Sequence, residues 1–378
     1  MSCVSATTLT QRFAQLTDPR VDRTKEHRLL DIVVLTICAI LAGADGWVAV
    51  EAFGHAKENW LRTFLELPNG IPSHDTFGRV FAALDPVEFQ QAFVSWVQAV
   101  SVRLKGEIVA VDGKSLRHSY DNYLGKNAIH MVSAWATAQH LVLGQRKIED
   151  KSNEITALPE LLQVLALEGC IVTVDALGCQ TDIAETIVNR GADYVLAVKE
   201  NQGKLHEDLK DLFDGATDVK FREVPHRHAQ QVTKDHGRLE IRECWVITDA
   251  EYLEFVRRHE AWKNLRSLIR IHTEVKRGRK RSADTRYFIS SLQATPQEML
   301  AAVRGHWGIE NGLHWVLDVV FREDDSRVRQ DHAAENFAVL RHIAVNLLNR
   351  ARNGKDSIKT LRLRAGWDEN FLAQLISQ

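Results

Sequence analysis

The sequence predicts an α/β protein in which a helical N-terminal region precedes alternating strands and helices. Three observations support this fold class. Helical hydrophobic patterns fill the first part of the chain, short apolar runs then alternate with amphipathic helical patterns, and a charged, short-stranded segment separates these from a helical C-terminal part. We therefore expect a helical region at 1–104, an α/β region at 105–214, a β-rich segment at 215–292 and a helical region at 293–378.

The N-terminal region is predicted to be a set of helices joined by tight turns. One helix should follow Ser73, a typical N-cap residue, and end near Asp85 because the residue before Pro86 disfavours the helical conformation. Short helices of this kind form a DNA-binding head in some proteins and a plain helical domain in others, and the pattern leaves both open. Further helices are expected at 29–44, 48–65 and 87–102.

From residue 107 onward, short apolar runs indicate strands. The order of elements is βββαβαβα, and a turn at 138–140 joins the second and third strands as a hairpin. Near-continuous apolar runs are typical of parallel strands that are covered on both faces. Strands are expected at 107–112, 129–137, 141–148, 170–175 and 193–198, and helices at 155–167, 181–190 and 202–213.

The β-rich segment contains a concentrated basic turn between two of its expected strands, which lie at 239–247, 265–274 and 286–290. A charged turn is commonly only a solvated loop. Here the cations outnumber the one Asp between 276 and 286, which favours contact with a phosphate backbone. They are Lys276, Arg277, Arg279, Lys280, Arg281 and Arg286. Trp245 and Trp262 in the same segment either pack in its core or stack on an unpaired base.

Composition limits the class of protein. The chain has 378 residues and a net charge of -2, so any nucleic-acid-binding surface must be local. Its five cysteines include no CxxC pair, which argues against a disulfide framework and favours a reducing, cytoplasmic setting. The apolar stretch 32–44 is shorter than the roughly 20 residues that a membrane span needs. We expect no membrane segment and no signal peptide.

Three carboxylates occupy positions where an unpaired negative charge would be costly. Asp112 ends the apolar run 108–111, Asp175 ends the run 170–174, and Glu310 lies within a helical pattern that begins at Thr295 and Pro296. Each has a simpler explanation, because Asp often caps a following turn and a buried Glu can pair with an arginine such as Arg304 or Arg341. Two Asp residues at the ends of parallel strands nevertheless favour one shared site.

The position of Glu310 on its helix helps to decide between a shared site and a separate structural role for this residue. The apolar positions Leu300, Val303, Trp307 and Leu317 recur at helical spacing, and Glu310 falls on that stripe. It is therefore expected to face inward. Oxygen ligands of this kind suit hard divalent cations.

The motifs around these carboxylates resemble those of the DDE insertion-sequence transposases, in the subgroup of the H-repeat-associated proteins. The motifs are Val111-Asp112-Gly113-Lys114-Ser115, Val174-Asp175-Ala176 and the long run from His306 to Val319, and further similarity covers 13–41, 71–84, 194–205 and 236–240. The resemblance implies an RNase H-like core, with which the order βββαβαβα agrees. It also implies that the segment 215–292 is an insertion before the helix of the catalytic Glu, and that 293–378 completes the core.

Carried over to this chain, the resemblance makes Asp112, Asp175 and Glu310 both the catalytic residues and the ligands of two Mg²⁺ ions, which Mn²⁺ could replace. Such ions lie about 3.5–4 Å apart. It implies cleavage of double-stranded DNA at the terminal repeats of an element and transfer to target DNA. A homodimer is expected, because two ends must be brought together.

One departure from the family affects DNA contacts. Where related enzymes carry a Tyr, an Arg and a Lys around the catalytic Glu, this chain has Val303, His306 and Leu317. His306, His314, Lys199 and Arg304 are the available substitutes. The full set of expected DNA-binding residues is Lys114, Lys199, Arg238, Lys276, Arg277, Arg279, Lys280, Arg281, Arg304, His306 and His314.

Two other functions remain open at this point. His306, Glu310 and His314 recur every four residues and could present zinc ligands from one helix, as in a zinc-dependent hydrolase. The chain could also be an inactive or domesticated DNA-binding protein derived from a transposase.

Overall fold

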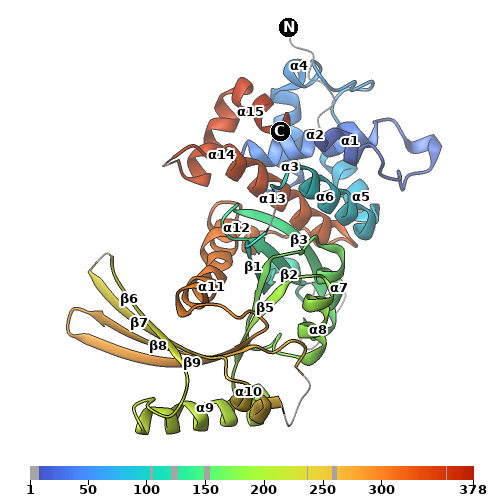
Figure 1. Ribbon diagram of the computed structural model, residues 1–378. Coiled ribbons are helices and arrows are strands. Elements are labelled where there is room, and N and C mark those ends of the chain that lie inside the picture. Colours follow the sequence, from blue (N-terminus) through green and yellow to red (C-terminus); the bar gives the residue numbers. More distant parts are fainter. Residues whose placement is uncertain are drawn as a thin grey trace. The chain divides into compact units, whose positions relative to one another are not determined.

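A computed structural model describes residues 8–102, 105–120, 127–148, 154–235, 237–257, 262–354 and 356–378 (Figure 1). The chain forms two compact units. Unit 1 comprises Met1–Arg103, Gly113–Asn153 and Glu310–Gln378, and unit 2 comprises Leu104–Asp112 and Glu154–Ile309. Each unit is built from separate stretches of sequence.

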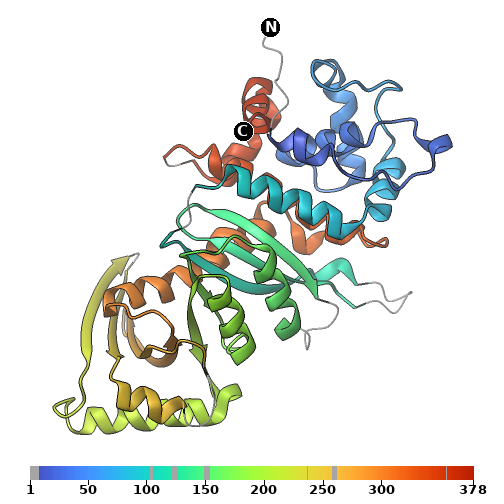
Figure 2. The ribbon, with the colours of Figure 1, turned by 45° about the vertical axis from the view of Figure 1, so that its right-hand side comes forward.

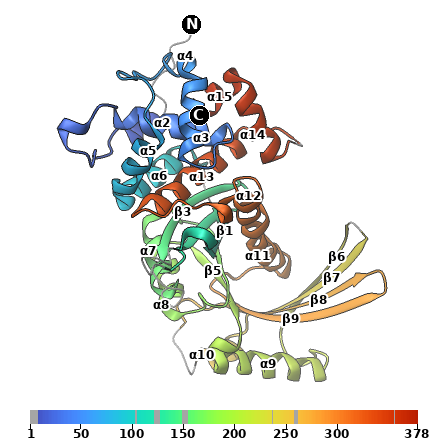
Figure 3. The same cartoon turned by 180° about the vertical axis from the view of Figure 1, so that it is seen from behind.

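Unit 1 is mainly helical, and α13 lies at its centre. This helix packs against α2, α5 and α6 and against strand β3 (Figure 3). Its 15 buried residues include polar Asn336 and Asn346, which hydrogen-bond to backbone groups of neighbouring elements. The helices are α1 Thr8–Phe13, α2 Leu29–Leu41, α3 Trp47–Ala56, α4 Glu58–Leu61, α5 His74–Ala83, α6 Pro86–Val100, α12 Trp315–Val319, α13 Ala333–Arg350, α14 Ile358–Trp367 and α15 Glu369–Ile376.

The N-terminal helices follow the sequence prediction with one error. Ser73 caps α5 by accepting a hydrogen bond from the Thr76 N–H, as predicted, and α5 ends at Ala83, close to the expected end near Asp85. Asp85 also caps α6 in front of Pro86, a role that was not predicted. The single helix expected at 48–65 is wrong. Lys57 leaves the helical conformation (φ -118°, ψ 15°), so the amphipathic pattern covers α3 and the short α4.

The β-hairpin of unit 1 pairs β2 (His130–Ala136) with β3 (Leu141–Ile148) in antiparallel register, as predicted. His140 in the turn has φ +54°, a left-handed conformation. The Asn346 side chain accepts from the Val142 N–H and donates to its C=O, so α13 is tied directly to β3.

Unit 2 contains the parallel strands. β1 (Ile108–Ser115, of which Ile108 to Asp112 lie in unit 2) pairs parallel with β4 (Ile171–Val174), and β4 pairs parallel with β5 (Asp193–Val198). Helices α7 (Glu154–Val164) and α8 (Thr181–Asn189) pack against each other. Among the described residues, nine strands form a mixed sheet in the order β3-β2-β1-β4-β5-β9-β8-β7-β6.

The remaining strands form a long antiparallel sheet, which we call the β6–β9 sheet. Helix α11 (Pro296–Ile309) covers one face of it and α9 (Gly203–Asp218) lies on the other (Figures 1 and 2). Cys244, Ile271 and Phe288 pack with Met299 and Leu300 of α11. The strands are β6 Arg227–Asp235, β7 Arg238–Ile247, β8 Ser267–Arg277 and β9 Lys280–Ser290, with α10 Ala250–Arg257 between β7 and β8.

The sequence prediction was incomplete in the β6–β9 sheet. Strand β6 and helix α10 were not expected, and β9 begins six residues before Arg286, the expected start. Strand β6 and the first half of β9 are polar and lack the apolar alternation of a half-buried strand. Helix α10 has an amphipathic pattern, with Leu253 and Val256 buried, and was missed. Four described cysteines, Cys38, Cys170, Cys179 and Cys244, are buried. Among the described residues, none of the helices combines the length and apolarity required to span a membrane.

Candidate functional site

Asp112 and Asp175 lie side by side in the parallel sheet of unit 2. Val111 pairs with Val174 in the register of β1 and β4, so the two Asp residues are the next position on each strand. Both are half-buried. The prediction that Asp112 ends its strand is wrong, because β1 continues to Ser115; it is β4 that ends here. Asp175 therefore lies at the carboxyl end of β4, where open α/β sheets bind their ligands, and Asp112 lies beside it on β1.

The turn after β4 fixes the Asp175 carboxylate. Its Oδ1 accepts hydrogen bonds from the N–H groups of Leu177 (3.1 Å) and Gly178 (3.3 Å), so this Asp does cap a turn. Gly178 is required for the tight fold of the turn, since a Cβ there would lie 2.2 Å from Val174 Cγ1. The cap uses one oxygen and orients the other.

Helix α11 is anchored to the same strand end. The His306 imidazole Nδ1 lies 3.1 Å from the Thr173 hydroxyl, two residues before Asp175. Burial lowers the pKa of His306, against the opposing effect of the Asp175 charge. His306 is thus a packed, hydrogen-bonded side chain, and its expected role in contacting DNA is not supported.

Glu310 follows α11 directly, but it does not face inward. The expected apolar stripe is wrong in part, because Trp307 is 46% exposed and Glu310 is exposed. The buried face of α11 runs through Met299, Leu300, Ala302 and Ile309 instead. The predicted cap is confirmed, since the Glu298 N–H donates to Thr295 Oγ1 and the Thr295 N–H donates to Glu298 Oε2.

The helix changes geometry at Glu310. Glu310–His314 form a π-helical turn (η5) before α12 begins, and Leu313 and His314 within it are buried. Gly312 allows this turn to approach Trp135, because a Cβ there would lie 2.9 Å from the indole ring. π-helical turns are often found at functional sites. The regular α-helix that would present His306, Glu310 and His314 every four residues is absent from this described segment.

A buried ionic cluster in unit 1 surrounds Lys114. Its ammonium lies 2.6 Å from an Asp318 oxygen, 2.8 Å from Glu323 and 3.6 Å from Asp324. Arg341 lies 3.6 Å from the other Glu323 oxygen. Burial opposes the charge of Lys114, yet Glu323 and Asp318 raise its pKa.

The cluster corrects one predicted role. Burial alone would raise the pKa of Glu323, but Lys114 and Arg341 keep it below its ordinary value. A lysine whose ammonium contacts three carboxylates is not available to a phosphate. The expectation that Lys114 binds DNA is therefore not supported. The acidic run 323–325 shortly after the Glu310 helix was the sequence signal for this cluster, and it was missed.

The other expected DNA-binding residues are mostly exposed. Lys199, Arg304 and the β8–β9 turn residues Arg277, Arg279, Lys280 and Arg281 are exposed, and so is Arg238 on β7. Lys276 lies 3.9 Å from Glu274, and His314 is buried. The basic segment is a hairpin turn, as predicted, because Arg277 pairs with Lys280 and Gly278 has φ +59°.

The two tryptophans of the insertion are packed. Trp262 is 3% exposed. Trp245 lies parallel to Phe221, and the Arg270 guanidinium sits 4.1 Å from the centre of its ring. Core packing, rather than base stacking, accounts for both.

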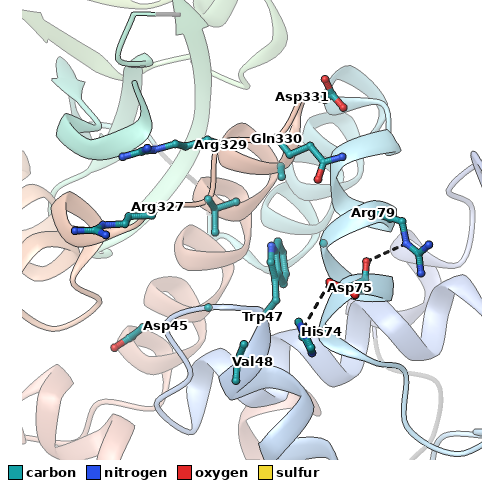
Figure 4. A pocket seen from close by; sticks show the side chains of 14 residues that line it. Asp45, Trp47, Val48, His74, Asp75, Arg79, Arg327, Arg329, Gln330 and Asp331 are labelled. Atoms are coloured by element: carbon teal, nitrogen blue, oxygen red, sulfur yellow. Dashed lines mark hydrogen bonds and ion pairs between the residues drawn. The ribbon is translucent and has the colours of Figure 1, made fainter. Parts of the chain in front are cut away.

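Unit 1 also contains a cavity of about 760 Å³ between α3, α5 and the segment that precedes α13 (Figure 4). Trp47 and Val48 give it an apolar side, while His74, Arg79 and Arg327 add polar groups. Asp45, Asp75 and Asp331 also line it, so its charge favours neither an anion nor a cation.

The chain matches two family models. Residues 10–97 match the DDE_Tnp_1-associated family and residues 103–347 match the transposase DDE domain. YhhI of Escherichia coli (strain K12), named as an H repeat-associated transposase, is 39% identical over 373 residues, covering 98% of this chain and 97% of that protein. YncI of Escherichia coli O157:H7, also named as a transposase, is 38% identical over 379 residues, covering 99% and 95%. Among solved structures, a piggyBac transposase synaptic complex with hairpin DNA aligns with a TM-score of 0.41 at 11% identity, covering 100% of this chain and 79% of that chain.

Proposed function

The chain belongs to the DDE transposase family, and we propose that it cleaves DNA at the ends of an insertion sequence and joins them to target DNA through Asp112, Asp175 and Glu310. The observation that carries this proposal is the register of β1 and β4, which makes Asp112 and Asp175 neighbours. The hydrogen bond from α11 to Thr173 supports the third member, since Glu310 follows four residues after His306.

The proposed catalytic core is RNase H-like. Support comes from the strand order β3-β2-β1-β4-β5, in which β2 and β3 are antiparallel and β1, β4 and β5 are parallel. In this interpretation residues 105–214 and 293–378 contribute to the core. The segment 215–292 is the insertion between them, and 1–104 is a helical region in front.

The three carboxylates are proposed to hold two Mg²⁺ ions, with Mn²⁺ able to substitute. The donor chemistry fits, because the carboxylate oxygens of Asp112, Asp175 and Glu310 suit both Mg²⁺ and Mn²⁺. When bound, such ions lower the pKa of the attacking water or 3′-hydroxyl and neutralise charge on the phosphoryl oxygens.

The chain's own residues would position the reacting groups. The Leu177 and Gly178 N–H groups fix the rotation of the Asp175 carboxylate, and the His306–Thr173 contact fixes the end of α11 against β4. Phosphoryl transfer depends mainly on such positioning and on electrostatic stabilisation. A homodimer that brings together two element ends, each recognised through its terminal repeat, completes the proposal.

The test is strand cleavage of a duplex that carries the element's own terminal repeat, with Mg²⁺ or with EDTA. Asp112→Asn, Asp175→Asn and Glu310→Gln should each lower cleavage by at least about a thousandfold while binding of the duplex is retained, since transition-state charge stabilisation of this kind is worth several kcal/mol. Glu207→Gln, an exposed position on α9, is the matched control and should cleave normally.

Cleavage by all three variants at the rate of the unmodified protein would refute the assignment. Binding of the repeat by the unmodified protein with no nicking in Mg²⁺ or Mn²⁺ would favour the alternative of an inactive, DNA-binding derivative.

A further inference from the structure

The β6–β9 sheet has two chemically different faces beyond the part that α11 covers. The register of β7, β8 and β9 is continuous, so side chains alternate between faces without a bulge. Cys244, Ile271 and Phe288 pack on α11, which identifies its face. Even-numbered residues of β7 and β9 and odd-numbered residues of β8 therefore lie on the α11 side.

The same alternation continues toward the β8–β9 turn. It places cations of β7, β8 and β9 on the α11 side. The guanidinium of Arg286 lies 5.4 Å from the centre of the Trp307 ring on α11, which confirms the assignment for β9. Arg304 projects from an exposed position of α11 itself. We call this set the basic face; it consists of Arg238 and Arg242 of β7, Arg277 of β8, Lys280 and Arg286 of β9, and Arg304.

Few carboxylates balance these charges. On β7, β8 and β9 the α11 side carries Glu240 and Asp284; Glu240 lies 2.6 Å from Arg242 and 3.3 Å from Arg238, and Asp284 lies 2.6 Å from Arg286. Within the described part of the chain, Arg277, Lys280 and Arg304 form no ion pair. The basic face therefore has an excess of positive charge.

Arg242 lies close enough to other cations of the basic face to be affected by their charge. Burial lowers its pKa, and the charges of Arg304 and Arg238 lower it further, against the effect of Glu240. Its Nη1 is buried and has no hydrogen-bond partner among the described residues. Glu240 satisfies Nη2 of this guanidinium but not Nη1, and a buried donor without an acceptor is unusual.

The opposite face carries a smaller excess of positive charge. Glu243 and Glu274 lie there, the second 3.9 Å from Lys276 and 4.0 Å from His272. Arg270 on this side is buried against Phe213 and Trp245 and donates to the Phe213 C=O on α9. The basic residues that remain there near the turn are Lys234, Lys276 and Arg281.

We propose that the basic face binds the sugar-phosphate backbone of double-stranded DNA, whereas the opposite face of the same sheet does not. This rests on the proposed function, which supplies DNA as the substrate. The face fits a polyanion because six cations, from three adjacent strands and from α11, outnumber the two carboxylates among them. Trp307 is 46% exposed and contacts Arg286 of the basic face. It lies three residues before Glu310 in the sequence, so this end of the basic face is the one nearest in sequence to the proposed catalytic Glu.

The turn of the hairpin provides a matched pair of variants. Arg277 and Lys280 form one cross-strand pair on the basic face, and Lys276 and Arg281 form the next pair on the opposite face. Arg277→Ala with Lys280→Ala therefore removes the same two residue types, and the same charge, as Lys276→Ala with Arg281→Ala. Binding to a fluorescent duplex of arbitrary sequence is measured by anisotropy in EDTA over a range of NaCl concentrations, so that no cleavage occurs.

The basic-face variant should lower the slope of log K against log salt by about two and weaken binding on the order of 10- to 60-fold at 0.1 M salt, because each phosphate contact contributes about 0.9 to the slope. The opposite-face variant should change binding less than about threefold. Equal losses in both variants, a larger loss in the opposite-face variant, or no loss in either would overturn the proposal. Because cleavage is absent from this assay, its result is independent of the test of Asp112, Asp175 and Glu310.

Discussion

Replacing Lys114 with methionine would remove the cation from the buried cluster while keeping a side chain of similar length. The ammonium lies 2.6 Å from Asp318 and 2.8 Å from Glu323, and the Glu323 side chain is only 2% exposed. In the variant, Glu323 would keep Arg341 at 3.6 Å, but Asp318 would lose its closest cation. The fold of unit 1 would then contain carboxylates without sufficient compensation.

The expected loss can be estimated from this geometry. Removing one member of a buried ion pair costs roughly 3–5 kcal/mol, because the remaining charge stays buried. Arg341 retains part of the compensation for Glu323, so we expect the lower end, about 3 kcal/mol in the free energy of unfolding. For a unit of the size of unit 1, a loss of about 3 kcal/mol corresponds to a fall of about 6–12 °C in Tm.

Scanning calorimetry of the full chain is the appropriate assay, with Lys210→Met, an exposed lysine of α9, as the control. Glu323→Gln and the double variant complete a double-mutant cycle. The two changes should be coupled by at least about 1 kcal/mol, since contacting residues show such interaction energies. A Tm within 2 °C of the unmodified protein for Lys114→Met, or strictly additive losses in the cycle, would refute the reasoning.

Two further predictions concern the surroundings of the proposed site. Gly178→Ala should displace the turn that holds Asp175 and lower both stability (by about 1–3 kcal/mol) and DNA cleavage, because the new Cβ would lie 2.2 Å from Val174 Cγ1. Gly203→Ala, where a Cβ meets nothing within 4 Å, is the control, and equal behaviour of the two variants would contradict the prediction. Burial lowers the pKa of His342 to about 4. An unfolded histidine binds a proton near pH 6.5 and the folded one does not, so this residue's contribution to stability should fall as pH drops from about 6.5 to 4, by up to about 1.4 kcal/mol per pH unit. Unfolding midpoints measured across that range should be less pH-dependent in His342→Gln; an unchanged pH dependence would exclude the effect.

The pattern of hydrophobic residues in the sequence predicted those helices and strands that have a continuous buried face. The strand at 193–198 and the hairpin of β2 and β3 were located from their apolar runs, and Ser73 and Thr295 were located from the chemistry of helix caps. These signals are local. A cap residue acts on N–H groups within three residues of itself, so the sequence around it contains the whole interaction.

The errors occurred where distant contacts decide the outcome. Strand β6 is polar and is held by its ladder to β7, which no local pattern reveals. Glu310 was expected to face inward on a regular helix, but the π-helical turn and its close approach to Trp135 depend on packing between remote segments. Lys114 was interpreted as a DNA contact because its partners are about two hundred residues away in sequence.

The Lys114 cluster also bears on how the proposed catalytic carboxylates are positioned. Lys114 lies two residues beyond Asp112 on β1, and its partner Asp318 lies eight residues beyond Glu310, on α12. A lysine that connects β1 with α12 therefore links the chain segments on which two of the three carboxylates are carried. Because Asp112 is half-buried and Glu310 is exposed, apolar packing alone cannot fix their side chains. Charged pairing just outside the carboxylates, together with the turn that holds Asp175, provides the rigidity that phosphoryl transfer requires.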